Sequence, residues 1–231
     1  MTNYVSILSG ALQTAADPER ALMMKRYLKD QFEFFGISAP KLKELRHGFI
    51  KLHGLPPAGE VNALVRALWN LPQREFQYCA AAISEKMLVK CGYGAIDFIE
   101  YMIVNKSWWD TVDWIASHHA GKWFKLFPGE MHSRTFNWIS SENIWLQRSA
   151  ILFQLKYKAL TDTEMLLSYC NSVAGSKEFF IRKAIGWALR EYSKTNPEAV
   201  MNYTSNSQLS GLSKREALKW LNRGSKKINP T

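Results

Sequence analysis

Trp109 and Asp113 are the two residues whose types and spacing could do chemistry together. Because they are four residues apart, they lie one above the other on a single face of a helix. A carboxylate at such a site can stabilise a developing positive charge or orient a water molecule. The alternative is an aspartate on a helix surface that simply pairs with a neighbouring Lys or Arg, and the sequence leaves both interpretations open.

Arg148 and Trp187 fall on later helices of the same pattern, and stacked helices would bring them beside Trp109 and Asp113. The planar guanidinium of Arg148 suits a phosphate, which it can bind through two parallel hydrogen bonds. Further cations, among them Lys156, Lys183 and Arg190, are expected on the surface. Each of these could equally be part of a solvated positive face.

The charge balance points to a polyanionic partner. Thirty Lys and Arg against twenty Asp and Glu give a net charge of +10, with an isoelectric point near 9.5. Nucleic acid is the commonest partner of such a basic surface, although a basic protein can also be merely soluble. The nine Trp residues suit contacts with bases, sugars or cations, but most of them must fill the core.

Composition excludes several classes of protein. Hydrophobic residues make up 47% of the chain, which is too many for a disordered protein, yet the apolar runs are too short to span a membrane. Cys79, Cys91 and Cys170 make no disulfide framework or zinc motif, and the five His lack metal-binding spacings. We therefore expect no metal and no cofactor. The first residues do not form a signal peptide, so a cytoplasmic protein is expected.

Apolar residues recur at helical spacing almost throughout the chain, which predicts an all-α fold. One predicted stripe lies between residues 60 and 71 and contains Val61, Leu64, Val65, Leu68 and Trp69. A second lies between residues 76 and 88 and contains Phe76, Ala80, Ile83 and Met87. Gly and Pro residues separate the helices.

A short phrase recurs near the start of every second predicted helix. It begins with a large apolar residue, namely Phe76, Trp109, Trp145, Phe179 and Leu212, at spacings of 33, 36, 34 and 33 residues. In the last three copies an Arg follows three positions later and an Ala five positions later. A period in the thirties with two helices per unit is typical of an α-solenoid. Ser107, Asn143, Ser176 and Ser213 are the candidate N-caps of the repeated helices.

The expected architecture is one curved domain over residues 1–231, with a basic concave face. Residues 1–50 would form a helical N-terminal cap with an aromatic and apolar cluster made of Tyr27, Leu28, Phe32, Phe34 and Phe35. Helix-pair repeats would occupy residues 59–222, because a single helix pair cannot bury its apolar stripe alone. Residues 223–231 are expected to form a frayed tail.

Long motifs of this sequence resemble a known family. They include Lys106-Ser107-Trp108-Trp109-Asp110 with Val112-Asp113, Asn143-Ile144-Trp145-Leu146-Gln147-Arg148, Phe153 to Lys158, and Ser176 to Trp187. The resemblance is to the bacterial AlkD-type DNA alkylation repair enzymes, which are alkylpurine DNA glycosylases built from HEAT-like repeats. It covers essentially the whole chain.

The resemblance implies a helical solenoid that cups double-stranded DNA in its concave face. We expect a monomer, because one concave chain is sufficient to bind a duplex, and we expect it to act in the bacterial cytoplasm, at the nucleoid. It implies base excision repair, in which the N-glycosidic bonds of cationic 3-methyladenine and 7-methylguanine are hydrolysed without drawing the base into a pocket. By the same resemblance Trp109, Asp113 and Trp187 are catalytic, while Arg148 and Tyr27 contact DNA near the lesion.

Three other functions remain to be weighed. Solenoids are often scaffolds, so a non-catalytic DNA-binding or adaptor protein is the main alternative. A helix-hairpin-helix glycosylase is disfavoured, because residues 53–59 lack the Gly-x-Gly pattern of such a hairpin. A metal-dependent dealkylase or deaminase is disfavoured by the spacing of the His residues.

Overall fold

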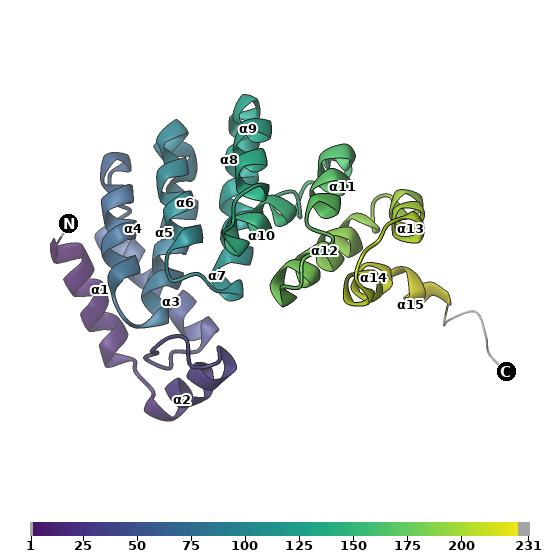
Figure 1. The fold of residues 1–231 in the computed structure, drawn as a ribbon. Helices are drawn as coiled ribbons and strands as arrows, with labels where there is room; N and C mark the ends of the chain where they lie inside the picture. Colours follow the sequence, from purple (N-terminus) through teal and green to yellow (C-terminus); the bar gives the residue numbers. More distant parts are fainter. Residues whose placement is uncertain (1, 226–231) are drawn as a thin grey trace. The chain divides into compact units, whose positions relative to one another are not determined.

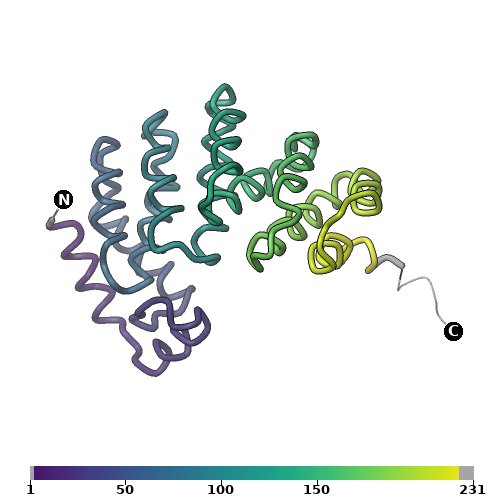
Figure 2. The backbone as a smooth tube through the Cα atoms, viewed as in Figure 1, coloured from purple at the N-terminus to yellow at the C-terminus, as the bar shows by residue number. Residues whose placement is uncertain are grey.

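The structure is a computed structural model that describes residues 2–225 (Figure 1). Every described element is a helix, and the sole β feature among these residues is an isolated bridge between Glu33 and Gln73. The chain divides into two compact units, Met1–Lys106 and Ser107–Thr231, and each is described by itself. The backbone trace in Figure 2 follows the same succession of helices along the chain.

The first unit contains six α-helices and two 3-10 turns. They are α1 (Thr2–Thr14), α2 (Pro18–Tyr27), α3 (Ala39–His53), η1 (Ala58–Glu60), α4 (Val61–Asn70), α5 (Arg74–Cys91), η2 (Gly92–Gly94) and α6 (Ala95–Val104). Helix α4 packs against both α5 and α6, and α1 packs against α3 and α4. This arrangement covers α4 on several sides, which explains why its apolar stripe is fully buried.

The second unit continues the succession of helices up to Ser225. Its elements are α7 (Trp109–Trp114), the π-helical turn η3 (Ile115–Ala120), α8 (Gly121–Leu126), α9 (Pro128–Ile139), α10 (Ile144–Leu152), η4 (Lys158–Leu160), α11 (Thr163–Ser172), α12 (Phe179–Tyr192), α13 (Pro197–Asn206), α14 (Gly211–Leu218) and α15 (Leu221–Ser225). Helix α10 packs against α7, α9, α11 and α12, and α12 packs against α13 and α14.

The predicted helical-repeat fold is confirmed in its elements and its core. All residues of the two predicted stripes on α4 and α5 are at most 2% exposed. The five apolar residues of the repeated phrase lie in the first turns of α5, α7, α10, α12 and α14. Ala150, Ala184 and Ala217, which follow the phrase at the same position in three helices, are also buried. Small residues at this position let the helices of neighbouring repeats approach closely.

A buried carboxylate holds the loop between α2 and α3. Glu75 is completely buried, and its carboxylate accepts hydrogen bonds from the backbone N–H groups of Phe35, Gly36 and Ile37 at 2.9–3.1 Å. Beside it, the guanidinium of Arg74 lies 3.7 Å from the centre of the Phe32 ring. These contacts satisfy polar groups that would otherwise be costly to bury.

The structure corrects the predicted role of Tyr27 and three of the predicted N-caps. Tyr27 is not part of the N-terminal cluster, because it is the last residue of α2, a helix with no buried residue, and is 69% exposed. Three of the four predicted N-caps are wrong. The N-cap of α7 is Trp108 rather than Ser107, and that of α12 is Glu178 rather than Ser176. Helix α14 is capped by Ser210, which accepts the N–H of Ser213. Asn143 does cap α10 as predicted, through the N–H groups of Trp145 and Leu146.

Most of the predicted tail lies outside the residues that the structure describes. Helix α15 extends to Ser225, so the first residues of the expected frayed segment are helical. Residues 226–231, which make up the rest of that segment, lie outside the described residues.

The substitution Gly36→Ala should destabilise the protein. Gly36 has φ +88°, and a Cβ there would clash with the carbonyl oxygen of Asp17 and lie 2.6 Å from the backbone nitrogen of Ala21. We expect the free energy of unfolding in urea to fall by about 2 kcal/mol or more, from strain and overlap together. Gly48→Ala is the control, because Gly48 lies inside α3 with open space around it, and it should be neutral or stabilising. Equal unfolding midpoints for the two variants would contradict this explanation.

Candidate active site

Asp113 and Arg148 form a two-pronged ion pair in the second unit. The Nε of Arg148 donates to Oδ1 of Asp113 at 2.7 Å, and its Nη2 donates to Oδ2 at 2.8 Å. Asp113 lies on α7 and Arg148 on α10, so the packing of these two helices brings the pair together. Parallel bonds of this kind fix the plane of the carboxylate as well as its position.

The pair is largely removed from solvent. The side chain of Arg148 is 5% exposed and that of Asp113 is 16% exposed. Burial raises the pKa of Asp113 above its ordinary value, while the bonds to Arg148 and its charge act in the opposite direction. Asp113 is the more exposed of the two side chains, so it is the member of the pair that a bound molecule can more easily approach.

The third interaction of Arg148 connects the pair to α12. Its Nη1 donates to the backbone carbonyl of Phe180 in the first turn of that helix. Trp187 is half-buried and lies two helical turns after Phe180, on the same side of α12. Trp109 is half-buried as well and lies one turn before Asp113 on α7. Arg148 thus bridges the helix that carries Trp109 and Asp113 and the helix that carries Trp187.

The structure places Arg148 differently from the sequence analysis. Its donors face Asp113 and Phe180 inside the protein, so direct contact of Arg148 with a phosphate stays a prediction. The alternative that Asp113 pairs with a neighbouring cation describes the observed geometry. That alternative assumed an exposed pair, however, and this pair is mostly buried.

Three aromatic residues beside the pair were not singled out as site residues from the sequence. The rings of Trp108, Trp145 and Phe180 lie with their centres 5.0–5.8 Å from one another. The sequence could have indicated these three residues, because each lies within one residue of the start of a repeated phrase. The Nε1 of Trp108 is buried without a hydrogen-bond partner, so this indole serves the packing between helices rather than a polar contact.

The π-helical turn η3 follows directly after the residues of the site. The hydroxyl of Ser117 donates to the backbone carbonyl of Asp113 at 2.6 Å and also contacts Nδ1 of His118 at 3.0 Å. Turns of this type often occur at functional sites because they displace the helix backbone locally.

The predicted DNA-binding cations have different surroundings. Lys183 and Arg190 on α12 both bind the carboxylate of Glu216 on α14, at 3.0 and 2.9 Å. These two cations and Lys219 hold the pKa of Glu216 below its ordinary value. Lys156 is exposed in the segment after α10, and Tyr27 is exposed in the other unit. The contacts of all four with DNA stay predictions.

No group of three or more His, Cys, Asp or Glu side chains in residues 2–225 is arranged to hold a metal ion. No described helix is long and apolar enough to cross a membrane.

Comparison with known proteins identifies the family. Residues 8–221 match the family model for DNA alkylation repair enzymes, which is nearly the whole chain. The chain belongs to the DNA alkylation repair enzyme family. It therefore has a role in the repair of alkylated DNA, and DNA is its partner. The resemblance drawn from the sequence motifs is confirmed.

A solved structure supports the same assignment. The chain is similar to a predicted DNA alkylation repair enzyme from Enterococcus faecalis, with 34% sequence identity and a TM-score of 0.82. The match covers 89% of this DNA alkylation repair protein and 96% of the other chain. No curated protein matches the sequence.

Arg148→Met should destabilise this repair protein in a pH-dependent way. The variant leaves the Asp113 carboxylate buried without its counter-charge, which typically costs about 3 kcal/mol or more at neutral pH. The pKa of Asp113 then rises further above its unfolded value, so the folded state binds a proton that the unfolded state releases. Stability lost at pH 7 should therefore return as the pH falls through this raised pKa.

Urea unfolding of the wild type and the variant between pH 7 and pH 5 measures the effect. The double variant Asp113→Leu with Arg148→Met is the control, because it removes both charges and should recover most of the stability. A loss that is the same at every pH, or is not recovered in the double variant, would contradict the interpretation.

Proposed function

We propose that this protein is a monofunctional DNA glycosylase that hydrolyses the N-glycosidic bond of cationic alkylated purines in duplex DNA. The substrates would be 3-methyladenine and 7-methylguanine, and the reaction would be the first step of base excision repair. The observation that carries the proposal is a partly exposed carboxylate, Asp113, which Arg148 holds with two hydrogen bonds in a DNA alkylation repair enzyme. Helices α7 and α12, which this arginine connects, carry the half-buried indoles of Trp109 and Trp187.

The charge of the damaged base explains why one carboxylate is enough. Methylation at N3 or N7 gives the purine a positive charge, and cleavage of its bond to C1′ returns the electron pair that neutralises it. No general acid is then needed, whereas ordinary glycosidases use two carboxyl groups. Positive charge moves onto the sugar as an oxocarbenium ion. Water adds its oxygen to C1′ and releases a proton.

Asp113 would stabilise the oxocarbenium ion. Each carboxylate oxygen accepts one hydrogen bond from Arg148 and keeps a further lone pair for water or the sugar. Because Arg148 also withdraws charge from the carboxylate, electrostatic stabilisation and orientation of water suit Asp113 better than strong base catalysis. Trp109 and Trp187 would pack on the deoxyribose and favour its cationic form by roughly 0.5–2 kcal/mol per contact.

Arg148 would act through Asp113 as a positioning residue. Its two bonds define the plane of the carboxylate, and its bond to the Phe180 carbonyl links that plane to α12. Lys156, Lys183, Arg190 and Tyr27 would bind the DNA backbone. A monomer without a pocket for the damaged base is sufficient for this reaction, because the carboxylate and the indoles would contact the deoxyribose rather than the base.

The test is base release from methylated duplex DNA, followed by chromatography of the free bases. The wild type should release 3-methyladenine and 7-methylguanine. Asp113→Asn should keep the fold and the affinity for DNA, with reduced stability because Arg148 loses its counter-charge. It should lose base release by about a hundredfold or more. Asp110→Asn, on the same helix, is the control and should keep most of the activity.

Two results would contradict the proposal. If the purified wild type binds methylated DNA and releases no base, the protein is a non-catalytic member of its family. If Asp113→Asn releases bases at the wild-type rate, the reaction does not depend on this carboxylate.

A further inference from the structure

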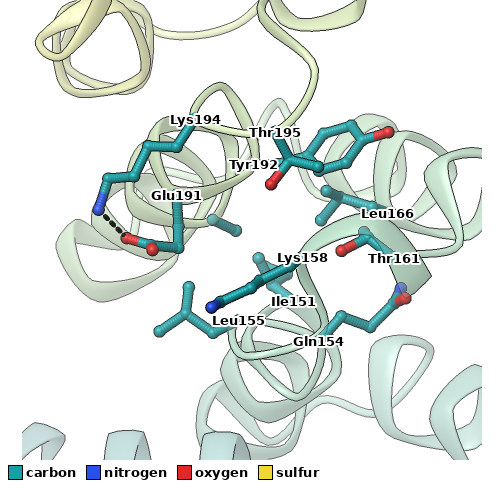
Figure 3. A pocket seen from close by; sticks show the side chains of 11 residues that line it. Ile151, Gln154, Leu155, Lys158, Thr161, Leu166, Glu191, Tyr192, Lys194 and Thr195 are labelled. Carbon is teal, nitrogen blue, oxygen red and sulfur yellow. Dashed lines mark hydrogen bonds and ion pairs between the residues drawn. The ribbon is translucent and has the colours of Figure 1, made fainter.

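The second unit contains a cavity of about 200 Å³ that shares no residue with the Asp113–Arg148 site. It lies where the C-terminal end of α10 faces α11 and the C-terminal end of α12 (Figure 3). Its volume is well below the roughly 300–1,000 Å³ of pockets for drug-sized ligands. At roughly 30 Å³ per water molecule it is also well above the space for a few waters. One flat ring system is a ligand of suitable size.

The floor of the cavity is apolar. Ile151, Leu166 and Ala188 line it and are at most 4% exposed, and Leu155 continues the same surface. An apolar floor offers no hydrogen bonds to a bare anion such as phosphate, so it disfavours inorganic ions as the main ligand. It favours a ring whose faces are apolar.

The rim of the cavity is polar and carries two ammonium groups. Lys158 lies across the opening, and Lys194 binds Glu191 on the opposite side at 2.6 Å (Figure 3). Within residues 2–225 the hydroxyls of Thr161 and Thr195 have no side-chain partner. The rim can therefore offer donors and acceptors to the edge of a ring. Because the carboxylate of Glu191 neutralises Lys194, Lys158 supplies the net positive charge of the rim.

The polar groups deeper in the wall are already occupied and keep the cavity in shape. The amide of Gln154 accepts the N–H of Asp162 at 2.7 Å, and the hydroxyl of Tyr192 contacts that of Thr163 at 2.5 Å. Lys158 has φ +54°, a left-handed conformation that is costly for a lysine. The preceding Tyr157 is buried and anchored, since its hydroxyl donates to the carbonyl of Gly121 at 2.7 Å. The opening is thus shaped by fixed elements on both sides.

We propose that this cavity binds one unpaired nucleobase turned out of a DNA strand, with Lys158 on a neighbouring phosphate. The ring would lie on the apolar floor, and its polar edge would meet the hydroxyls of Thr161 and Thr195. The site would give the protein a preference for DNA with an extrahelical nucleotide. It rests on the DNA binding of the proposed function, and base release is not required for it.

The test compares the binding of two duplexes by fluorescence. One carries 2-aminopurine as a single-nucleotide bulge, and the other carries it paired with thymine. The wild type should bind the bulged duplex about tenfold more tightly, with a change in 2-aminopurine emission when its environment changes. Ala188→Leu fills the floor and Lys158→Ala removes the charge at the opening, so both should reduce the preference. Lys122→Ala, an exposed lysine on α8, is the matched control and should keep it.

Lys158→Ala keeps the test decisive if Ala188→Leu fails to fold. The preference for the bulged duplex should be reduced while affinity for the paired duplex changes about twofold or less. Equal affinities of the wild type for the two duplexes would overturn the proposal. So would equal losses on both duplexes, which would make Lys158 a general phosphate contact, or displacement of the bulged duplex by inorganic phosphate alone, which would indicate an anion site.

The outcome is separable from that of the proposed function. Base release from a fully paired methylated duplex reports on Asp113, and the preference for a bulge reports on the cavity. Folded Ala188→Leu protein should retain base release.

Discussion

The buried ion pair between Asp113 and Arg148 is the interaction on which the functional site depends. A carboxylate with 16% of its side chain exposed would lose much of its charge to protonation or rotate toward solvent if it had no partner. Arg148 lowers the pKa of Asp113 against the effect of burial and holds the carboxylate in one plane with two bonds. The cost of desolvating the two charges offsets much of their attraction, so the pair adds little to the stability of the fold. Its main contribution is to orient the carboxylate of Asp113.

The pair depends in turn on the helical repeat. Asp113 is the fourth residue after Trp109, and Arg148 is the third residue after Trp145 in the next copy of the phrase. Helices α7 and α10 pack closely enough for the two side chains to meet. A second ion pair joins the last two copies of the phrase, where Lys183 and Glu216 both occupy the position of Asp113 and bind each other. Ion pairs between successive helices therefore recur along this surface. Only the first of these two pairs sits beside Trp109 and the ring cluster of Trp108, Trp145 and Phe180.

Much of the fold was predictable because its signals are local. The stripe on α4 and the repeated phrase follow from spacing along one helix, and both predictions are confirmed. The partner of a charged side chain can lie on another helix, far away in the sequence, so the sequence did not predict it. Arg148 has the chemistry to bind a phosphate, but the distance between α7 and α10 decided that it binds Asp113. Likewise, Tyr27 was assigned to a core cluster by composition, although its helix turns no residue inward.

The most direct measurement is the single-turnover rate of base release from one duplex sequence that carries either 7-methylguanine or neutral hypoxanthine. If Asp113 only assists the departure of a base that is already cationic, 7-methylguanine should be released at least about a hundredfold faster. Comparable rates would show that the protein activates neutral leaving groups by another route. They would contradict the role given to the Asp113–Arg148 pair.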